Sequence, residues 1–370
     1  MKEFQPLRII EVTRETPEAI SVTLEIPPAL RDAYRFAPGQ HLNVRATIDG
    51  EEQRRSYSIC GPAPGLEGAG LRIAIKRIAD GRFSHWASET LKAGDTLDAM
   101  PPAGRFVLPP GDGAQRHIVA FAAGAGITPI IAMIRHALET EPATSVTLVY
   151  GNRALDSIIF REELEDLKDR HLGRFTLLHV LSRNEESSAP LFEGRIRAET
   201  VTALAATLFK PADVAGFFLC GPGSMIKDTR NALLALAVPR ERIHHEFFAA
   251  GGGAFRSKGA PKTPAAPPQS KIASSAVDGT EAIAILDGIR HRFVVPPGGH
   301  VVDAALAAGL RVPYSCKGGM CCTCRARLVE GEAQMTVNYS LEPWEIERGF
   351  ILTCQAVPKS PRIVVDYDAM

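Results

Sequence analysis

The sequence has no net charge and no long unbroken apolar run. Its 42 basic and 42 acidic side chains cancel, so we expect no nucleic-acid partner and no anionic membrane partner. The most apolar run, residues 117–134, is broken by Gly124, Gly126, Thr128 and Pro129, which favours a strand, a turn and a buried helix over a membrane span. Residues 1–6 lack the charged and apolar regions of a signal peptide, and we expect a cytoplasmic protein.

The number of cysteines is odd, so they cannot all form disulfide pairs. There are seven, and four of them form one pattern, which argues against a disulfide framework. Cys316, Cys321 and Cys324 follow the spacing C-x4-C-x2-C, and Cys354 comes thirty residues later. This is the plant-type arrangement for a [2Fe-2S] cluster. The glycines inside the loop let the backbone turn and point its N–H groups at the inorganic sulfides.

Other metal sites fit the cysteine pattern less well. A structural zinc site usually pairs C-x2-C with a second such pair or with histidines, and only one such pair is present here. His291 and His300 lie upstream and are not interleaved with the cysteines, which argues against a Rieske centre. Cys322 lies off the spacing, and we interpret it as a spare thiol.

Short strands are predicted up to about residue 108. Residues 20–26, 41–48, 56–59 and 71–78 are rich in β-branched residues and partly alternate, and Asp49-Gly50 is a hairpin turn signal. A small antiparallel barrel, interrupted by one helix at about 84–91, is the natural interpretation.

Two stretches of this barrel suggest ligand binding. The first consists of Arg55, Ser56, Tyr57 and Ser58. Its cation, ring and hydroxyl could serve a phosphate, a flat ring face and a ring nitrogen. The second consists of Gly81, Arg82, Phe83 and Ser84, where N–H groups at a helix start could bind a pyrophosphate. Taken alone, an exposed sheet face and an ordinary N-cap are the alternatives.

Strands and helices alternate from residue 115 to about 248. Apolar runs at 117–123, 145–150, 175–181 and 216–220, with helical periodicity at 129–138, 157–171 and 224–237, predict a doubly wound parallel sheet. Gly124 and Gly126 form the first strand-to-helix turn, with Thr128 expected as N-cap and Pro129 at the first helical position. Such a turn suits a dinucleotide pyrophosphate. The G-x-G-x-x-G pattern is incomplete, so a plain tight turn stays open.

The choice of nicotinamide is a question of charge. A 2′-phosphate is bound by arginine and hydroxyl groups, whereas a bare ribose is bound by a carboxylate. Arg153 follows the second strand of the sheet, and no Asp or Glu occupies that strand end, although Asp156 is close. We therefore expect NADPH, with solvated surface arginines as the alternative.

The order of these stretches resembles the ferredoxin-NADP reductase superfamily, in which R-x-Y-S precedes G-x-x-S and G-x-G-x-x-P is usual. The resemblance implies that Arg55 binds flavin phosphate, that Tyr57 and Ser58 lie against the isoalloxazine, and that FAD rather than FMN is bound. It also assigns further residues to the cofactor sites: Ser182 and Arg183 to NADP, Cys220, Gly221 and Pro222 near the nicotinamide, and Glu246 and Phe248 near the flavin. A hydrogen-bonded core edge is the alternative for the last two.

Nearly the whole chain resembles the reductase subunits of ring-1,2-phenylacetyl-CoA epoxidases. The likeness includes Tyr150-Gly151-Asn152-Arg153, Cys316-Lys317-Gly318-Gly319 and, most narrowly, Asn338-Tyr339-Ser340-Leu341-Glu342-Pro343. It implies that the partners are the subunits of a di-iron oxygenase that epoxidises phenylacetyl-CoA. Lys317, Arg325 and Arg327, with Glu342, Glu345 and Glu347 beyond, are the expected docking surface. A solvated charged face is the alternative.

The sequence therefore predicts three domains and a tether. We expect an antiparallel β-barrel that binds FAD at 1–110, an NADP-binding doubly wound α/β domain at 111–250, a flexible linker at 251–279 and an α+β plant-type [2Fe-2S] ferredoxin domain at 280–370. Flavin would accept a hydride and pass single electrons to the cluster, so no general acid or base is required and no catalytic residue is assigned. A reductase for a ketosteroid or ring hydroxylase, or a redox-sensing iron-sulfur protein, stays open.

Overall fold

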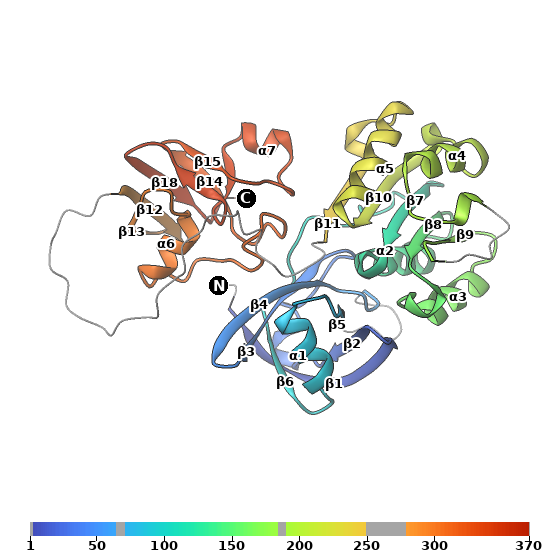
Figure 1. Ribbon diagram of the computed structural model, residues 1–370, viewed down its shortest axis with the longest axis horizontal. Coiled ribbons are helices and arrows are strands. Elements are labelled where there is room, and N and C mark those ends of the chain that lie inside the picture. Colours follow the sequence, from blue (N-terminus) through green and yellow to red (C-terminus); the bar gives the residue numbers. More distant parts are fainter. Residues whose placement is uncertain (1–2, 64–70, 184–189, 249–278, 370) are drawn as a thin grey trace. The chain divides into compact units, whose positions relative to one another are not determined.

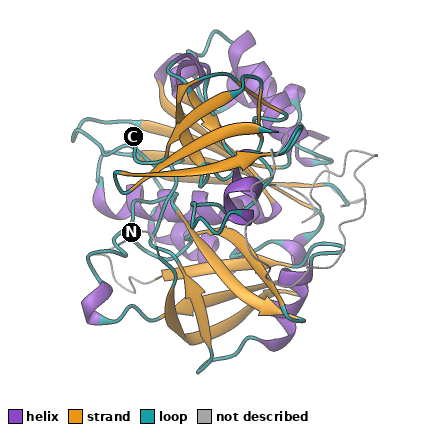
Figure 2. Cartoon of the chain, turned by 90° about the vertical axis from the view of Figure 1, so that its left-hand side faces the viewer, coloured by secondary structure: helices purple, strands orange, loops and turns teal. Residues whose placement is uncertain are grey.

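The computed structural model describes residues 3–63, 71–183, 190–248 and 279–369. The described residues up to 248 belong to one compact unit and those from 279 to a second, and Figure 2 distinguishes their helices and strands. The predicted linker, 251–279, lies outside the described residues except for its last position. No helix in these ranges is long and apolar enough to span a membrane.

The N-terminal part of the first unit is an antiparallel barrel (Figure 1), with strand order β4-β3-β6-β1-β2-β5. Its strands are β1 (Gln5–Thr16), β2 (Ala19–Leu24), β3 (His41–Ile48), β4 (Glu51–Ser58), β5 (Leu71–Lys76) and β6 (Thr96–Ala99). A bridge between Ile59 and Ile73 joins the two outer strands. Alternate residues such as Leu7 and Ile9 point into the core. Helix α1 (Arg82–Thr90) adds Phe83 and Ala87, one turn apart. The predicted antiparallel fold is confirmed.

The sequence pattern did not indicate strand β6, nor strand β1. Charged residues such as Arg8, Glu11 and Arg14 alternate with the apolar ones of β1, and they hide the strand because one of its faces meets solvent. Its register against β2 is irregular between Ile9 and Glu11.

A five-stranded parallel sheet completes the first unit, in the order β11-β10-β7-β8-β9. The strands are β7 (His117–Ala123), β8 (Ser145–Asn152), β9 (Phe175–Leu181), β10 (Val214–Gly221) and β11 (Ile243–Phe247). The helices are α2 (Ile127–Thr140), α3 (Arg161–Arg170), α4 (Ala198–Thr207) and α5 (Gly223–Ala235). Two separate apolar clusters cover the two faces, one with α2 and α3 and the other with α4 and α5. The doubly wound prediction is confirmed.

The second unit is a mixed sheet packed on a short helix. Its strands, in the order β13-β12-β18-β14-β16, are β12 (Thr280–Leu286), β13 (Ile289–Val295), β14 (Arg325–Glu330), β16 (Phe350–Leu352) and β18 (Arg362–Asp366). Strands β15 (Ala333–Met335) and β17 (Ala356–Pro358) form a separate two-stranded sheet. The helices of this unit are α6 (Val301–Ala307) and α7 (Pro343–Glu347). Val301 and Val302 join strand residues in one core.

The side chain of Glu345 is an internal part of this second unit. It is 0% exposed, accepts a hydrogen bond from Arg325 Nε at 2.9 Å and accepts another from the N–H of Glu342 at 3.1 Å. The Arg325 guanidinium also lies 3.4 Å from the ring centroid of Phe350. The prediction that Glu345 belongs to a docking surface is therefore wrong, because its carboxylate is buried and paired with Arg325.

Replacing Glu345 tests this internal ion pair. Glu345→Ala would leave Arg325 without its partner, so we expect the free energy of unfolding of this unit to fall by about 3–5 kcal/mol. The sequence has two tryptophans, Trp86 in the first unit and Trp344 in the second. Urea unfolding followed by Trp344 fluorescence in a Trp86→Phe background measures the change. Glu347→Ala on the same helix is the control, and equal midpoints for both variants would contradict the expectation.

Candidate functional site

The loop between α6 and β14 brings the four predicted cysteines together in two pairs. Cys316 contacts Cys321, and Cys324 contacts Cys354, each through its sulfur. Charge interactions between Cys321 and Cys324, and between Cys316 and Cys354, link the two pairs. The fourth ligand candidate, Cys354, follows β16, so the sheet holds it in place.

Backbone N–H groups of the loop point at the sulfurs. Lys317, Gly319 and Cys322 have φ angles of 48°, 74° and 54°, the left-handed conformation that turns successive N–H groups inward. The N–H of Gly318 donates to Cys316 Sγ at 3.3 Å. Contact with Cys321 and donors from the backbone lower the pKa of the Cys316 thiol to about 5. In each pair, one cysteine, Cys316 or Cys354, has a lowered pKa, and its partner, Cys321 or Cys324, has a raised one. The lowered pKa favours the thiolate, which is the form that binds metal.

The arrangement in pairs fits an iron-sulfur cluster better than a single zinc ion. A structural zinc needs four ligands at one point. A [2Fe-2S] cluster has two irons and takes four cysteines, so two thiols for each iron match the observed pairs.

The family-specific motif at residues 338–343 forms a turn that supports the cysteine loop. The side-chain oxygen of Asn338 accepts hydrogen bonds from the N–H groups of Ser340 and Leu341, at 3.2 and 2.8 Å. This turn presents Ser340, whose hydroxyl donates to the carbonyl of Gly319 at 3.2 Å and accepts from Cys322 Sγ at 3.0 Å. Cys322 thus supports the loop and is not a member of the two pairs. Lys317 pairs with Asp303 at 2.7 Å, which reduces its value as a docking charge.

The end of β4 carries the first predicted flavin stretch. The Tyr57 ring lies 5.8 Å from that of Phe83, and burial raises the pKa of Tyr57. The Arg55 guanidinium bonds Gln53 Oε1 at 3.2 Å, and alternation places Arg55 and Tyr57 on the same strand face. Ser56 belongs to the other face and donates to Asn43 Oδ1 at 2.7 Å.

In the second flavin stretch, backbone N–H groups are more available for binding a ligand than the side chains are. Ser84 Oγ donates to the carbonyl of Gly81 at 3.0 Å and accepts from the N–H of Ile78 at 3.3 Å. A Cβ at Gly81 would lie 2.5 Å from Ser84 Oγ, so the turn requires glycine. The Phe83 side chain is buried in the barrel core, and Arg82 pairs with Glu51 and Asp49 on the β3–β4 hairpin. The N–H groups that begin α1 have no partner within the helix, and they can bind an anion.

The dinucleotide turn lies where β7 and β10 end side by side. A Cβ at Gly126 would lie 2.1 Å from the carbonyl oxygen of Cys220, so only glycine permits this close approach. The expected cap is wrong: α2 begins at Ile127, Gly126 is its N-cap, and Thr128 Oγ1 donates to the carbonyl of Ala125 at 3.0 Å. Pro129 is accordingly the third helical residue. The point between β7 and β10 is where the strand order reverses, the usual position of ligands in such sheets.

Glu246 connects this sheet with the barrel. Ser58 Oγ donates to Glu246 Oε2 at 3.3 Å, and His41 Nδ1 lies 4.0 Å from Oε1. Burial raises the pKa of Glu246 to about 8, so its carboxyl group is mostly protonated at neutral pH. Burial, with the nearby Glu246, also raises the pKa of the Cys220 thiol. Cys220 and Glu246 are partners in the register of β10 and β11.

Residues on both sides of Glu246 fix the ends of these two strands. The N–H of Phe248 donates to the carbonyl of Gly221 at 3.3 Å, and its ring packs on the core shared with α2. Pro222 is the N-cap of α5. The structure therefore brings Ser58, Cys220 and Glu246 into one place.

The predicted 2′-phosphate residues lie at the neighbouring ends of β8 and β9. The N–H of Ser182 donates to the carbonyl of Asn152 at 3.0 Å, and that of Arg183 donates to the carbonyl of Arg153 at 2.9 Å. Ser182 and Arg183 are exposed at this edge. The two strand ends thus present two arginines and a hydroxyl together.

Sequence reasoning missed two barrel residues at the dinucleotide turn. A Cβ at Gly124 would lie 3.8 Å from Lys76 Nζ, so this amine is beside the turn. Glu18 lies 3.7 Å from Lys76 Nζ and 3.6 Å from Arg153 Nη1. The alternating pattern of β5 could have indicated that Lys76 ends the strand, but not that it meets the second domain.

Comparisons with known proteins match three stretches of the chain to three domain families. Residues 6–108 match the oxidoreductase FAD-binding domain, residues 121–231 the oxidoreductase NAD-binding domain, and residues 284–359 the 2Fe-2S iron-sulfur cluster binding domain. The chain is 40% identical to one of the subunits of the 1,2-phenylacetyl-CoA epoxidase of Escherichia coli, over 100% of this chain and 99% of that one. It is 33% identical to the 3-ketosteroid-9-alpha-monooxygenase, ferredoxin reductase component, of Rhodococcus rhodochrous, over 98% and 96%.

A solved structure shows the same fold. Phthalate dioxygenase reductase, described as a modular structure for electron transfer from pyridine nucleotides to [2Fe-2S], aligns over 98% of each chain with a TM-score of 0.58 and 24% identity. The fold and the sites define the class: this is an electron-transfer oxidoreductase that binds FAD, a nicotinamide dinucleotide and a [2Fe-2S] cluster. The chain belongs to the family of oxygenase reductase components that includes the two relatives above.

Serine substitutions test the assignment of the cluster ligands. We expect Cys316→Ser, Cys321→Ser, Cys324→Ser and Cys354→Ser each to lose most of the bound iron and acid-labile sulfide, because each removes one of four thiolates. Cys322→Ser should keep both, since Cys322 belongs to neither pair. Iron and sulfide analysis after anaerobic purification measures the effect. Retention of the cluster in a Cys354→Ser variant, or its loss in Cys322→Ser, would contradict the assignment.

Proposed function

We propose that this chain carries electrons from NADPH, through FAD and a [2Fe-2S] cluster, to a di-iron oxygenase that epoxidises phenylacetyl-CoA. The observation that carries the proposal is the 40% identity to the Escherichia coli epoxidase component along both complete chains. The partners would be the oxygenase subunits of that complex. The activity would take place in the cytoplasm, where reducing conditions disfavour disulfides.

The residues of the first unit have distinct roles in this proposal. Bound FAD would take two electrons as a hydride from the nicotinamide and release them singly, as the one-electron cluster requires. Tyr57 would cover one face of the ring system, and Arg55 and the start of α1 would bind its phosphates. Ser58 donates a hydrogen bond to Glu246, and the protonated carboxyl group of Glu246 adds no negative charge where electrons arrive. Cys220 and Gly221, at the end of β10, would together position the nicotinamide.

NADPH is favoured over NADH by the charges at the ribose end. Backbone hydrogen bonds bring Arg153 beside Ser182 and Arg183, and a planar guanidinium binds phosphate at two points. Glu18 is the acidic side chain that contacts Arg153, but it extends from the barrel and not from a strand end of the sheet. Lys76 beside Gly124 adds a cation for the pyrophosphate.

Reconstitution with purified oxygenase subunits tests the proposed acceptor. With NADPH, oxygen and phenylacetyl-CoA, we expect epoxide formation that depends on this chain and stays coupled to NADPH oxidation. The 33% identity to a ketosteroid monooxygenase reductase makes that oxygenase the comparison. Faster reduction of the ketosteroid oxygenase than of the epoxidase would replace the proposal with the other acceptor, and failure to oxidise any nicotinamide would reject both.

Removing the arginines at the ribose end tests the choice of nicotinamide. Arg153→Ala and Arg183→Ala should each raise the KM for NADPH by about 10- to 100-fold, since a charge-assisted hydrogen bond contributes about 1.5–3 kcal/mol. The KM for NADH should change little. Arg161→Ala is the control, because Arg161 pairs with Glu165 on the surface of α3. A wild-type preference for NADH, or an equal rise for both nucleotides, would refute the NADPH assignment.

A further inference from the structure

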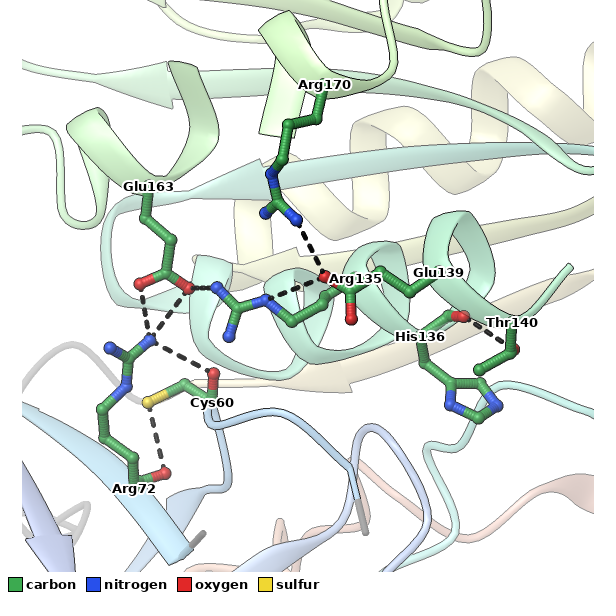
Figure 3. A network of polar contacts seen from close by, with 8 residues as sticks. All are labelled: Cys60, Arg72, Arg135, His136, Glu139, Thr140, Glu163 and Arg170. Carbon is green, nitrogen blue, oxygen red and sulfur yellow. Dashed lines mark hydrogen bonds and ion pairs between the residues drawn. The ribbon is translucent and has the colours of Figure 1, made fainter. Parts of the chain in front are cut away.

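A line of alternating charges crosses from the barrel to the parallel sheet and includes none of the residues assigned above to a cofactor. It consists of Arg72 on β5, Glu163 on α3, Arg135 and Glu139 on α2, and Arg170 on α3 (Figure 3). The side chains of Arg72, Glu163 and Arg135 are only 22%, 21% and 11% exposed. Ion pairs with so little solvent contact are far less screened than surface pairs.

Glu163 accepts hydrogen bonds from both domains. One Nη of Arg72 donates to both of its carboxylate oxygens, at 2.9 and 2.7 Å, and Arg135 donates to Oε1 from the other side. The Arg72 guanidinium also lies 4.8 Å from the ring centroid of Phe160, the N-cap residue of α3. A neutral residue at 163 would leave two guanidinium groups facing each other with no charge between them.

On the barrel side, the line leads to the flavin strand. The N–H of Cys60 donates to the carbonyl of Arg72 at 2.8 Å, its thiol donates to the same carbonyl at 3.2 Å, and Arg72 donates back to the Cys60 carbonyl at 3.4 Å (Figure 3). Cys60 is two residues beyond Ser58. Arg72 is therefore bonded, through its backbone and its side chain, to a residue just beyond the strand that carries Tyr57 and Ser58.

On the other side, the line leads to the dinucleotide turn. Arg135 belongs to α2, which starts at Ile127 directly after the turn at Gly124–Gly126. An α-helix is a rigid element of the kind that can carry coupling between two sites, and α2 connects Arg135 with that turn. Glu163 thus joins the two elements whose separation decides how far the nicotinamide lies from the flavin.

We propose that Glu163 is a positioning residue for hydride transfer: by bonding Arg72 and Arg135 together, it sets the distance between the flavin and nicotinamide sites. The inference rests on the proposed function. In that reaction the nicotinamide is oxidised by losing a hydride, which is one proton with two electrons, and the flavin is reduced by accepting it. Transfer needs the reacting atoms at about 3–3.5 Å, and a misplacement of about 1 Å costs up to about 100-fold in rate.

The experiment is rapid mixing of the FAD-loaded, full-length chain with NADPH. Glu163→Gln keeps the shape of the side chain and removes its charge. We expect the limiting rate of flavin reduction to fall by about 10- to 100-fold, while the Kd for NADPH from the same titration changes less than about threefold. The long-wavelength charge-transfer absorbance between nicotinamide and flavin should weaken, because it depends on their distance. Glu163→Asp, which keeps the charge, should recover part of the rate.

The control variant is Glu165→Gln, on the same helix, whose carboxylate pairs only with Arg161 among the ion pairs of the described residues. It should behave as wild type. Electron transfer from photoreduced flavin to the cluster should be unchanged in Glu163→Gln, which separates positioning of the nicotinamide from general loosening of the protein.

Three results decide against the proposal. A wild-type limiting rate in Glu163→Gln, or a change confined to the Kd, would overturn the positioning role alone. Wild-type protein that NADPH does not reduce would instead refute the proposed function on which the role rests. If Glu163→Gln loses its FAD on purification, Arg72→Lys decides, because lysine keeps the charge but cannot reproduce the same contacts: a lowered rate supports the role and a wild-type rate overturns it.

Discussion

The contact between Ser58 and Glu246 is the constraint on which the first unit depends. The two residues are 188 positions apart in the chain, and one ends a barrel strand while the other lies in the last strand of the parallel sheet. A hydride moves only over a contact distance, so the two folds must be held against each other at this point. Protonation of Glu246 follows from its burial, and it keeps the junction free of a repelling charge.

The second unit solves a different problem, which is to hold four thiolates in a small space. Backbone N–H groups stabilise the sulfurs, and left-handed residues aim those groups. The residues around the loop hold it in place: Asn338 shapes a turn, the turn presents Ser340, and Ser340 binds the Gly319 carbonyl. Charges near the cluster are largely neutralised internally, by Asp303 for Lys317 and by Glu345 for Arg325.

Much of the fold was predictable because its signals are local. Strands β3, β7 and β9 were predicted with the observed bounds. Apolar, β-branched stretches bounded by turn residues can be recognised as strands from a single sequence. Strand β1 was missed because its charged alternate residues imitate a surface segment. The cap at Thr128 was misplaced because α2 starts earlier, at Ile127, where close packing of Gly126 on Cys220 fixes the turn.

The sequence by itself indicated the [2Fe-2S] cluster through its cysteine spacing, and the order of R-x-Y-S and the glycine turn indicated FAD and a nicotinamide through the resemblance to a known superfamily. Only the tertiary structure decided which charges work together. Arg72 and Glu163 are 91 residues apart, and on its own helix Glu163 is one of several carboxylates that look like solvated surface. Their partnership arises from packing of two domains, and so do the burial of Glu345 and the place of Lys76. Local conformation depends mainly on adjacent residues, whereas the electrostatic energy of a charged side chain depends on the charges and the burial that the tertiary fold places around it.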